Sequence, residues 1–136
     1  EIEELKGSVT MTTLLPGAAL FLEMKYPPAR KMIDSGLPVA LASDYNPGSS
    51  PSGNMKFILS LATIIMKLTP EEAVNAATLN SAYAMGISDS HGSIGTGKRA
   101  NVLITKEISS LWYLPYAYTS NLIDSVILGG KVVSRG

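Results

Sequence analysis

Residues 44–53, with the sequence DYNPGSSPSG, contain the side chains best suited to chemistry. Asp44 closely follows the apolar run 37–42, which shows no polar alternation and therefore predicts a strand buried on both faces. A carboxylate at the end of such a strand would be poorly hydrated and would need a metal ion, another cation or several hydrogen-bond donors. Asp and Asn before Pro-Gly are also ordinary turn formers. The spacing therefore leaves a catalytic carboxylate and a simple Asx-turn equally open.

A second glycine-rich segment, residues 92–98, imitates the phosphate-binding pattern G-x-x-x-x-G-K. Arg99 stands where such loops have the Ser or Thr that binds magnesium. The segment also follows a predicted helix and enters a predicted strand, which is the reverse of the order in a phosphate-binding loop. We therefore expect a glycine-bounded turn and no nucleotide site. His91, beside this segment, is expected to be a surface residue, because a single imidazole cannot form a stable metal site unaided.

Elements on either side of Asp44 must position its loop. A strand is predicted over residues 9–15, which are rich in β-branched side chains and end at a Pro-Gly pair. A helix over residues 27–35 follows, opened by a Pro-Pro pair and ended by Gly36. The second strand is the apolar run 37–42. Strand, helix and strand together predict one βαβ unit with parallel strands.

Helical periodicity after the loop predicts a helix over residues 54–67 that is covered over most of its circumference. Its polar residues fall on one narrow stripe: Lys56, Ser60, Thr63 and Lys67. The run T-P-E-E from Thr69 combines a capping box with proline at the first helical position, and so predicts the start of the next helix. Thr78 is expected to cap a further short helix, which ends at Met85 with Gly86 as its left-handed terminator.

From Gly86 onward, the pattern changes to short β segments separated by glycines. Residues 101–105 predict a strand, and residues 124–133 predict a hairpin that turns at paired glycines. Residues 112–118 place four aromatic side chains around one proline, and we expect these rings to pack against a neighbouring surface. The whole pattern indicates an α/β protein.

Composition limits the class of protein. Of the 136 residues, 46% are hydrophobic and 16% are charged, which is typical of a globular chain and excludes wholesale disorder. The net charge of zero argues against nucleic-acid and anionic-membrane partners, and no apolar run approaches the ~20 residues of a membrane helix. Without cysteine, there is no disulfide framework and no thiolate metal site. A cytoplasmic protein is therefore expected.

Longer motifs run in order along the chain: TLLPGA at residues 13–18, YPPARKMIDSGLPVALA at 26–42, SDYNPGSSP at 43–51, LTPEEA at 68–73, G-x-I-x-x-G-K-x-A-N-V at 92–102 and VILGGKVV at 126–133. Over nearly its whole length, the chain thereby resembles the imidazolonepropionases, a family of metal-dependent amidohydrolases. The D-[YF]-N-P-G-S loop is specific to that family, whereas the glycine-rich motif is shared by the wider superfamily. Asn101 departs from the usual aspartate in that motif, with little consequence for chemistry.

This resemblance implies a fold and an activity. The fold would be the C-terminal part of a (β/α)8 barrel, at residues 1–87, with part of a small β-sandwich, at residues 88–136. A whole barrel needs ~250 residues, so we expect the chain to be the C-terminal portion of a longer enzyme. Members of the family hydrolyse the ring amide of 4-imidazolone-5-propanoate to N-formimidoyl-L-glutamate in cytosolic histidine degradation. They use one divalent metal, zinc or iron.

The resemblance also implies roles for residues of the loop. Asp44 matches the aspartate that binds the metal and accepts the proton of the attacking water. Asn46 and Gly48 match positions that contact substrate or product. Ser49 matches a hydroxyl that contacts the imidazolone, and Tyr45 is assigned to packing. The other metal ligands of the family are histidines that this chain lacks, and its single histidine matches none of them.

Because those histidines would come from the remainder of the enzyme chain, we expect the isolated 136-residue chain to be inactive. An unpaired sheet edge favours association, so a homo-oligomer is expected. Two other functions stay open: hydrolysis of a different cyclic amide, and a non-catalytic binding or assembly domain that keeps the fold without metal. Comparing turnover of the imidazolone with turnover of hydantoins distinguishes the first alternative from the imidazolonepropionase reaction. The metal content of the full-length protein distinguishes the second, because a binding domain would hold no metal.

Overall fold

Two β-sheets organise the residues that the computed structural model describes, which are 2–135. β1 (Thr12–Leu14) and β2 (Val39–Leu41) form a parallel pair, and β3 (Val102–Thr105), β4 (Ile123–Leu128) and β5 (Lys131–Arg135) form an antiparallel sheet in the order β3-β4-β5. The helices are α1 (Ile2–Leu5), α2 (Pro16–Phe21), α3 (Ala29–Asp34), α4 (Met55–Ile64), α5 (Pro70–Ala77), α6 (Leu79–Ala84) and α7 (Tyr113–Tyr116). None of the helices within residues 2–135 is long and apolar enough to cross a membrane. The fold is mixed α/β, as the sequence predicts.

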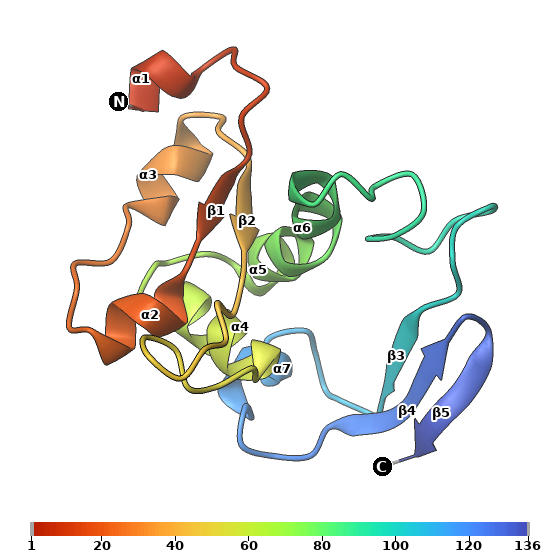
Figure 1. Cartoon of the computed structure of the whole chain (residues 1–136). Coiled ribbons are helices and arrows are strands. Elements are labelled where there is room, and N and C mark those ends of the chain that lie inside the picture. The colour runs from red at the N-terminus through yellow and green to blue at the C-terminus, as the bar shows by residue number, and fades with distance from the viewer. Residues whose placement is uncertain (1, 136) are drawn as a thin grey trace.

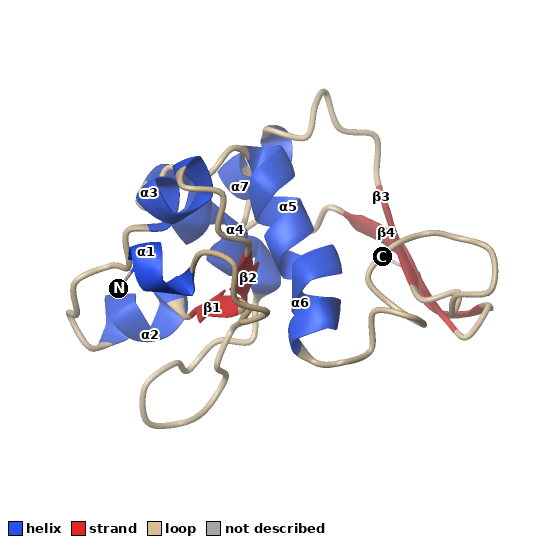
Figure 2. Cartoon of the chain, turned by 90° about the horizontal axis from the view of Figure 1, so that it is seen from above, coloured by secondary structure: helices blue, strands red, loops and turns tan. Residues whose placement is uncertain are grey.

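The helices gather around the parallel pair. In Figure 1, α2 and α3 lie on one side of β1 and β2, and α5 and α6 lie on the other. Figure 2 shows the antiparallel sheet beyond α6, at the far end of the molecule from the N-terminus. The main hydrophobic core is built from β1, β2, α3, α4 and α5. The parallel pair therefore lies at the centre of the core, and the antiparallel sheet lies outside it.

The βαβ unit predicted from the sequence is confirmed, with strands shorter than the expected ranges 9–15 and 37–42. β1 and β2 pair in parallel register over three residues each. Val9 lies outside this ladder and is 89% exposed. The strands are short because a segment forms sheet only where a partner strand satisfies its backbone groups. All three residues of β2 are buried, as the lack of polar alternation predicts.

Local capping signals place most helix ends where the sequence predicts them. In the capping box of α5, the Thr69 hydroxyl accepts from the Glu72 N–H at 3.2 Å, and the Glu72 carboxylate accepts from the Thr69 N–H at 2.8 Å. Gly36 and Gly86 follow α3 and α6 with φ of +81° and +70°, a conformation that glycine adopts without a Cβ penalty. α4 ends at Ile64, short of its predicted end at residue 67.

Thr78 stands at the N-cap position of α6, as the sequence predicts, but its side chain does not cap that helix. Thr78 is the single residue between α5 and α6, and its side chain makes no capping bond to α6. Its hydroxyl donates instead to the Val74 carbonyl of α5 at 2.7 Å. The last four carbonyls of a helix lack intrahelical partners, so a hydroxyl at this junction can serve the end of one helix in place of the start of the next.

Helix α4 is covered on its polar stripe as well as on its apolar face. Ile58 is fully buried in the core. Ser60, on the stripe, is also buried, and its hydroxyl donates to the carbonyl of Pro115 in α7. The ring of Phe57 lies 5.5 Å from that of Tyr118, measured between centroids. These contacts hold the segment between β3 and β4 against α4.

The expected packing of the aromatic residues 112–118 is wrong for Trp112 and Tyr116 and only partly met by Tyr113 and Tyr118, which are 38% and 37% exposed. Trp112 and Tyr116 are 61% and 80% exposed. The buried positions on this segment are the smaller residues Pro115 and Ala117. Because α7 is a single turn, the side that packs on α4 accommodates these two residues and leaves the neighbouring rings outside.

The turns predicted for the second half of the chain are confirmed. Gly129 and Gly130, which connect β4 to β5, have φ of +56° and +81°, the two left-handed residues that a type I′ hairpin turn requires. Residues 92–98 form the expected glycine-bounded turn. The Lys98 ammonium donates to the Ser88 carbonyl at 2.6 Å, so the lysine closes its own loop.

An ion pair joins α3 to α5. Two nitrogens of the Arg30 guanidinium donate to the Glu72 carboxylate at 2.7 and 3.1 Å, and a third donates to Asp34 at 2.9 Å. The bonds from Arg30 hold the pKa of the Glu72 carboxyl below its ordinary value, and the bond from the Thr69 N–H lowers it further. The carboxylate therefore serves both the helix start and the contact between helices.

Replacing Glu72 with Gln is expected to change how stability depends on pH. A carboxyl with a lowered pKa in the folded state adds stability above its unfolded pKa of about 4.3, and this stability is lost as the pH falls through the folded pKa. Glu72→Gln keeps the side-chain size and a capping oxygen but removes the charge. In urea unfolding, native protein should exceed the variant in stability at pH 7, and the difference should shrink at pH 3. An equal difference at both pH values would contradict a stabilising charge.

Candidate active site

Asp44 lies just past the carboxyl end of β2, where the loop over residues 44–53 begins. Its φ is +50°, a left-handed conformation that is uncommon for a residue with a Cβ. The expectation of a poorly hydrated carboxylate is wrong, because the side chain is exposed. Burial already falls off over Ala42 and Ser43, between the strand and the loop. The carboxylate is therefore accessible to a ligand.

Asn46 organises the loop from within. Its Oδ1 accepts from the N–H groups of Gly48 and Ser49 at 2.9 and 2.8 Å, which is an Asx-turn. Its Nδ2 donates to the Asp44 carbonyl at 2.5 Å and to the Ser49 hydroxyl at 2.9 Å. The Asx-turn that the sequence left open is thus present, and it lies directly after Asp44.

Ser49 and Gly48 complete the turn. The Ser49 hydroxyl lies 3.5 Å from Oδ2 of Asp44, to which it donates. Gly48 is exposed, and a Cβ there would lie 3.3 Å from Oδ1 of Asn46. Tyr45 is 70% exposed, with its ring against the last residue of the loop. The fold therefore brings Asp44, Asn46, Gly48 and Ser49 together on one surface turn, in which Asn46 and Ser49 are half-buried.

Sequence reasoning missed two residues that support this turn. Ser50 is only 2% exposed, and its hydroxyl donates to the Ser43 carbonyl at 2.6 Å. Gly17 in α2 packs so closely that a Cβ there would lie 2.8 Å from the Ser50 Oγ. Glycine inside a helix costs stability relative to alanine. The sequence carries no clear signal of this contact, because the Pro-Gly pair predicts the end of a strand and α2 (Pro16–Phe21) is not predicted from the residues.

The turn offers a single metal ligand. No group of three or more His, Asp or Glu side chains within residues 2–135 could hold a metal ion. His91 lies in the loop after α6, half-buried, with Nδ1 2.8 Å from the Ser90 hydroxyl. The Asp44 carboxylate is exposed, and its bond from Ser49 is long. The Asp44 carboxylate is therefore available as a single oxygen ligand on this turn.

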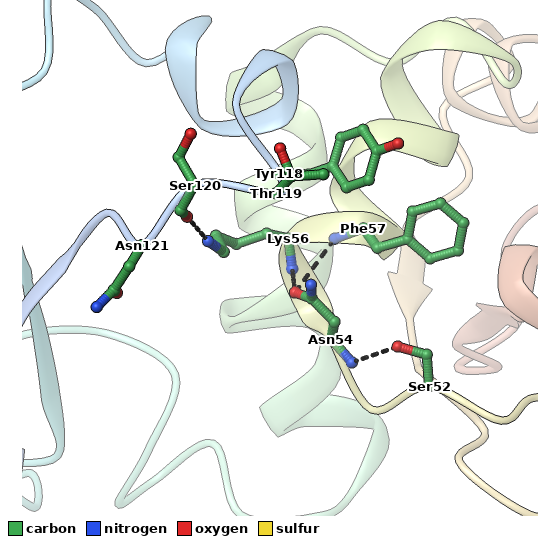
Figure 3. Close-up of a pocket in the computed structure, with 8 residues that line it drawn as sticks. All are labelled: Ser52, Asn54, Lys56, Phe57, Tyr118, Thr119, Ser120 and Asn121. Carbon is green, nitrogen blue, oxygen red and sulfur yellow. Dashed lines mark hydrogen bonds between the residues drawn. The ribbon is translucent and has the colours of Figure 1, made fainter. Parts of the chain in front are cut away.

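A separate pocket of about 440 Å³ lies where the far end of the loop meets the segment after α7. Figure 3 shows its lining residues: Ser52, Asn54, Lys56, Phe57, Tyr118, Thr119, Ser120 and Asn121. The Lys56 ammonium donates to the Ser120 carbonyl. None of the four residues of the turn lines this pocket.

Sequence comparison with known proteins confirms the resemblance that the motifs indicate. The model of the Amidohydrolase family matches residues 1–133. The chain is 58% identical over 133 residues to an imidazolonepropionase of Flavobacterium johnsoniae, covering 98% of this chain and 32% of that protein. It is 43% identical over 135 residues to an imidazolonepropionase of Shouchella clausii, covering 99% and 30%. The chain thus spans about a third of the length of the curated relatives it matches.

Solved structures share the fold. An adenosine deaminase from Xanthomonas campestris with bound zinc superposes with a TM-score of 0.85 at 23% identity, covering 96% of this chain and 33% of that one. The guanine deaminase of E. coli superposes with a TM-score of 0.83 at 20% identity, covering 100% and 36%. At these identities, the two structures show that the fold is shared and do not indicate the substrate of this chain. Sequence match over nearly the full length and agreement in fold lead to the same assignment, and the chain belongs to the amidohydrolase family.

Proposed function

We propose that this chain is the C-terminal portion of an imidazolonepropionase, an enzyme that hydrolyses the cyclic amide of 4-imidazolone-5-propanoate to N-formimidoyl-L-glutamate in histidine degradation. The observation that carries this proposal is the exposed turn of Asp44, Asn46, Gly48 and Ser49 at the carboxyl end of a parallel strand. In (β/α)8 barrels, the carboxyl ends of the strands are where the active site forms. The 58% identity to an imidazolonepropionase supports the choice of substrate.

The proposed fold of the full protein follows from the same family. Residues 1–87 would supply the last strands and helices of the barrel, and residues 88–136 the C-terminal part of a small β-sandwich. The parallel pair and the antiparallel sheet of this chain are compatible with those two parts. The enzyme is proposed to be cytoplasmic and a homo-oligomer. β1 and β2 pair only with each other among the described residues, and the remaining strands of the barrel would pair with their free edges.

The proposed cofactor is one divalent metal, zinc or iron. Asp44 would be the ligand from this chain, and the remainder of the enzyme would supply histidines. A zinc-containing neighbour in the same fold supports a divalent metal. When bound beside Asp44, such a metal would lower the pKa of a bound water far enough to supply a nucleophile at neutral pH.

The residues of the turn would supply proton transfer and contacts to the substrate. Asp44 takes a proton from the water that attacks the ring amide carbon, and then gives that proton to the nitrogen as the C–N bond breaks. This role suits an accessible carboxylate whose direction is fixed by the loop. Ser49 lies beside it and would contact the imidazolone, and Asn46 and Gly48 would contact substrate or product. Asn46 also holds the shape of the turn.

Turnover of 4-imidazolone-5-propanoate by the full-length protein tests this function. Ultraviolet absorbance should show rapid loss of the imidazolone and slower or no loss of hydantoins, and metal analysis should find about one equivalent per chain. A preference for hydantoins would indicate a different cyclic amidohydrolase. A protein without metal or turnover would indicate a binding or assembly domain. The isolated 136-residue chain should show no turnover, because a catalytic divalent site normally needs at least three protein ligands.

A further inference from the structure

Both peptide groups that flank Asp44 are held by side chains of its own loop. On the N-terminal side, the Ser50 hydroxyl donates to the Ser43 carbonyl at 2.6 Å. On the C-terminal side, the Asn46 amide donates to the Asp44 carbonyl at 2.5 Å. Because each peptide group is planar, the two bonds together restrain φ and ψ of Asp44. Such restraint accounts for a left-handed φ of +50° in a residue that is not glycine.

The N-terminal restraint is fixed by packing from another part of the fold. Ser50 is 2% exposed, and its backbone carbonyl accepts from the Asn46 N–H at 3.0 Å. Its hydroxyl lies against Gly17 of α2, where a Cβ would come within 2.8 Å. The hydroxyl is therefore confined between α2 and the Ser43 carbonyl. The direction of the exposed Asp44 side chain thus depends on a buried group that cannot reach a ligand itself.

We propose that Ser50 is a positioning residue for Asp44. Its buried hydroxyl holds the peptide before Asp44 in the orientation that directs the carboxylate toward a metal ion and the reacting water. This inference rests on the proposed function and adds a residue that touches neither metal nor substrate. Partners that orient metal ligands commonly matter for affinity as much as for activity, so metal binding itself can report the role.

The fold provides a matched control for Ser50→Ala. Ser60 is also 2% exposed, and its hydroxyl also donates to a carbonyl distant in sequence, that of Pro115. It lies on α4 and has no bond to the turn of Asp44. Ser50→Ala and Ser60→Ala therefore remove the same kind of buried hydrogen bond, and comparable losses of stability are expected. Only the first should affect the carboxylate.

The experiment uses the full-length protein that contains this chain. The dissociation constant for Zn²⁺ is measured on metal-free protein by competition with a chromophoric chelator, and kcat and KM are measured with 4-imidazolone-5-propanoate. We expect Ser50→Ala to weaken Zn²⁺ binding by roughly 10- to 100-fold and to lower kcat more than it changes KM. Ser60→Ala should keep native values of both. Gly17→Ala displaces the same hydroxyl without removing it and should also weaken Zn²⁺ binding. It replaces Ser50→Ala in the experiment if that variant does not fold.

Two results would overturn the inference while leaving the proposed function intact. One is native Zn²⁺ affinity and kcat in Ser50→Ala when Asp44→Asn is impaired in both. The other is an equal loss in Ser50→Ala and Ser60→Ala, which would indicate general destabilisation. If Asp44→Asn itself binds Zn²⁺ and turns over substrate like native protein, the proposed role of Asp44 fails, and the positioning role fails with it. Only the absence of imidazolone turnover by native protein would overturn the proposed function.

Discussion

Asp44→Asn in the full-length protein is expected to reduce hydrolysis of 4-imidazolone-5-propanoate by roughly 10²- to 10⁴-fold, the usual contribution of a general base. Asparagine has nearly the same size as aspartate and is among the residues that best tolerate a left-handed φ, so the backbone of the turn should persist. The variant removes the charge that would bind a cation and the oxygen that would accept the proton of water. The loss should therefore appear in kcat and in bound metal.

Asp89→Asn is the matched control for this experiment. Asp89 is an exposed aspartate in the loop after α6, far along the chain from the turn of Asp44. The same substitution there should leave turnover and metal content at native values. Hydrolysis by Asp44→Asn within about tenfold of native would show that Asp44 is not the essential base, because general base catalysis contributes at least about 10²-fold.

Gly17→Ala is expected to lower the free energy of unfolding by about 1–3 kcal/mol, the usual cost of forcing an extra carbon into a close-packed site. The new Cβ would lie 2.8 Å from the Ser50 Oγ and 3.1 Å from the Ile58 Cδ1. Both partners are held in place, because Ile58 is fully buried and Ser50 is bonded to the Ser43 carbonyl. Urea unfolding followed by circular dichroism measures the change as a lower midpoint.

Gly53→Ala separates crowding from the general effect of replacing glycine. Gly53 ends the same loop, and neither it nor Gly17 has a left-handed φ. A Cβ at Gly53 would lie 3.7 Å from the Tyr45 ring, an ordinary contact. Alanine also restricts the unfolded chain, which stabilises by about 0.4–1 kcal/mol where the native conformation suits it. Gly53→Ala should therefore be neutral or slightly stabilising. Equal destabilisation by both substitutions would contradict the close packing of α2 on Ser50.

Several features were determined by the sequence because they depend on residues a few positions apart. The capping box of Thr69 and Glu72 needs only the spacing of the two side chains, and Gly36 supplies a left-handed helix end by lacking a Cβ. The turn after Asp44 was predictable for the same reason, whereas the chemical roles of its residues came from the family resemblance. Asp44 and Ser49 are five positions apart, and the Asn-Pro-Gly between them favours a turn, so any fold of this segment keeps them together.

The tertiary structure alone decided which distant groups meet. The hydroxyls of Ser50 and Ser60 look equivalent in the sequence, yet one is held beneath α2 and bonds to Ser43, while the other bonds to Pro115. The exposure of the carboxylate after β2 also depended on where the chain leaves the core. A buried hydroxyl must find an acceptor, but which acceptor it finds depends on how the helices and strands pack, and no local pattern of residues encodes that.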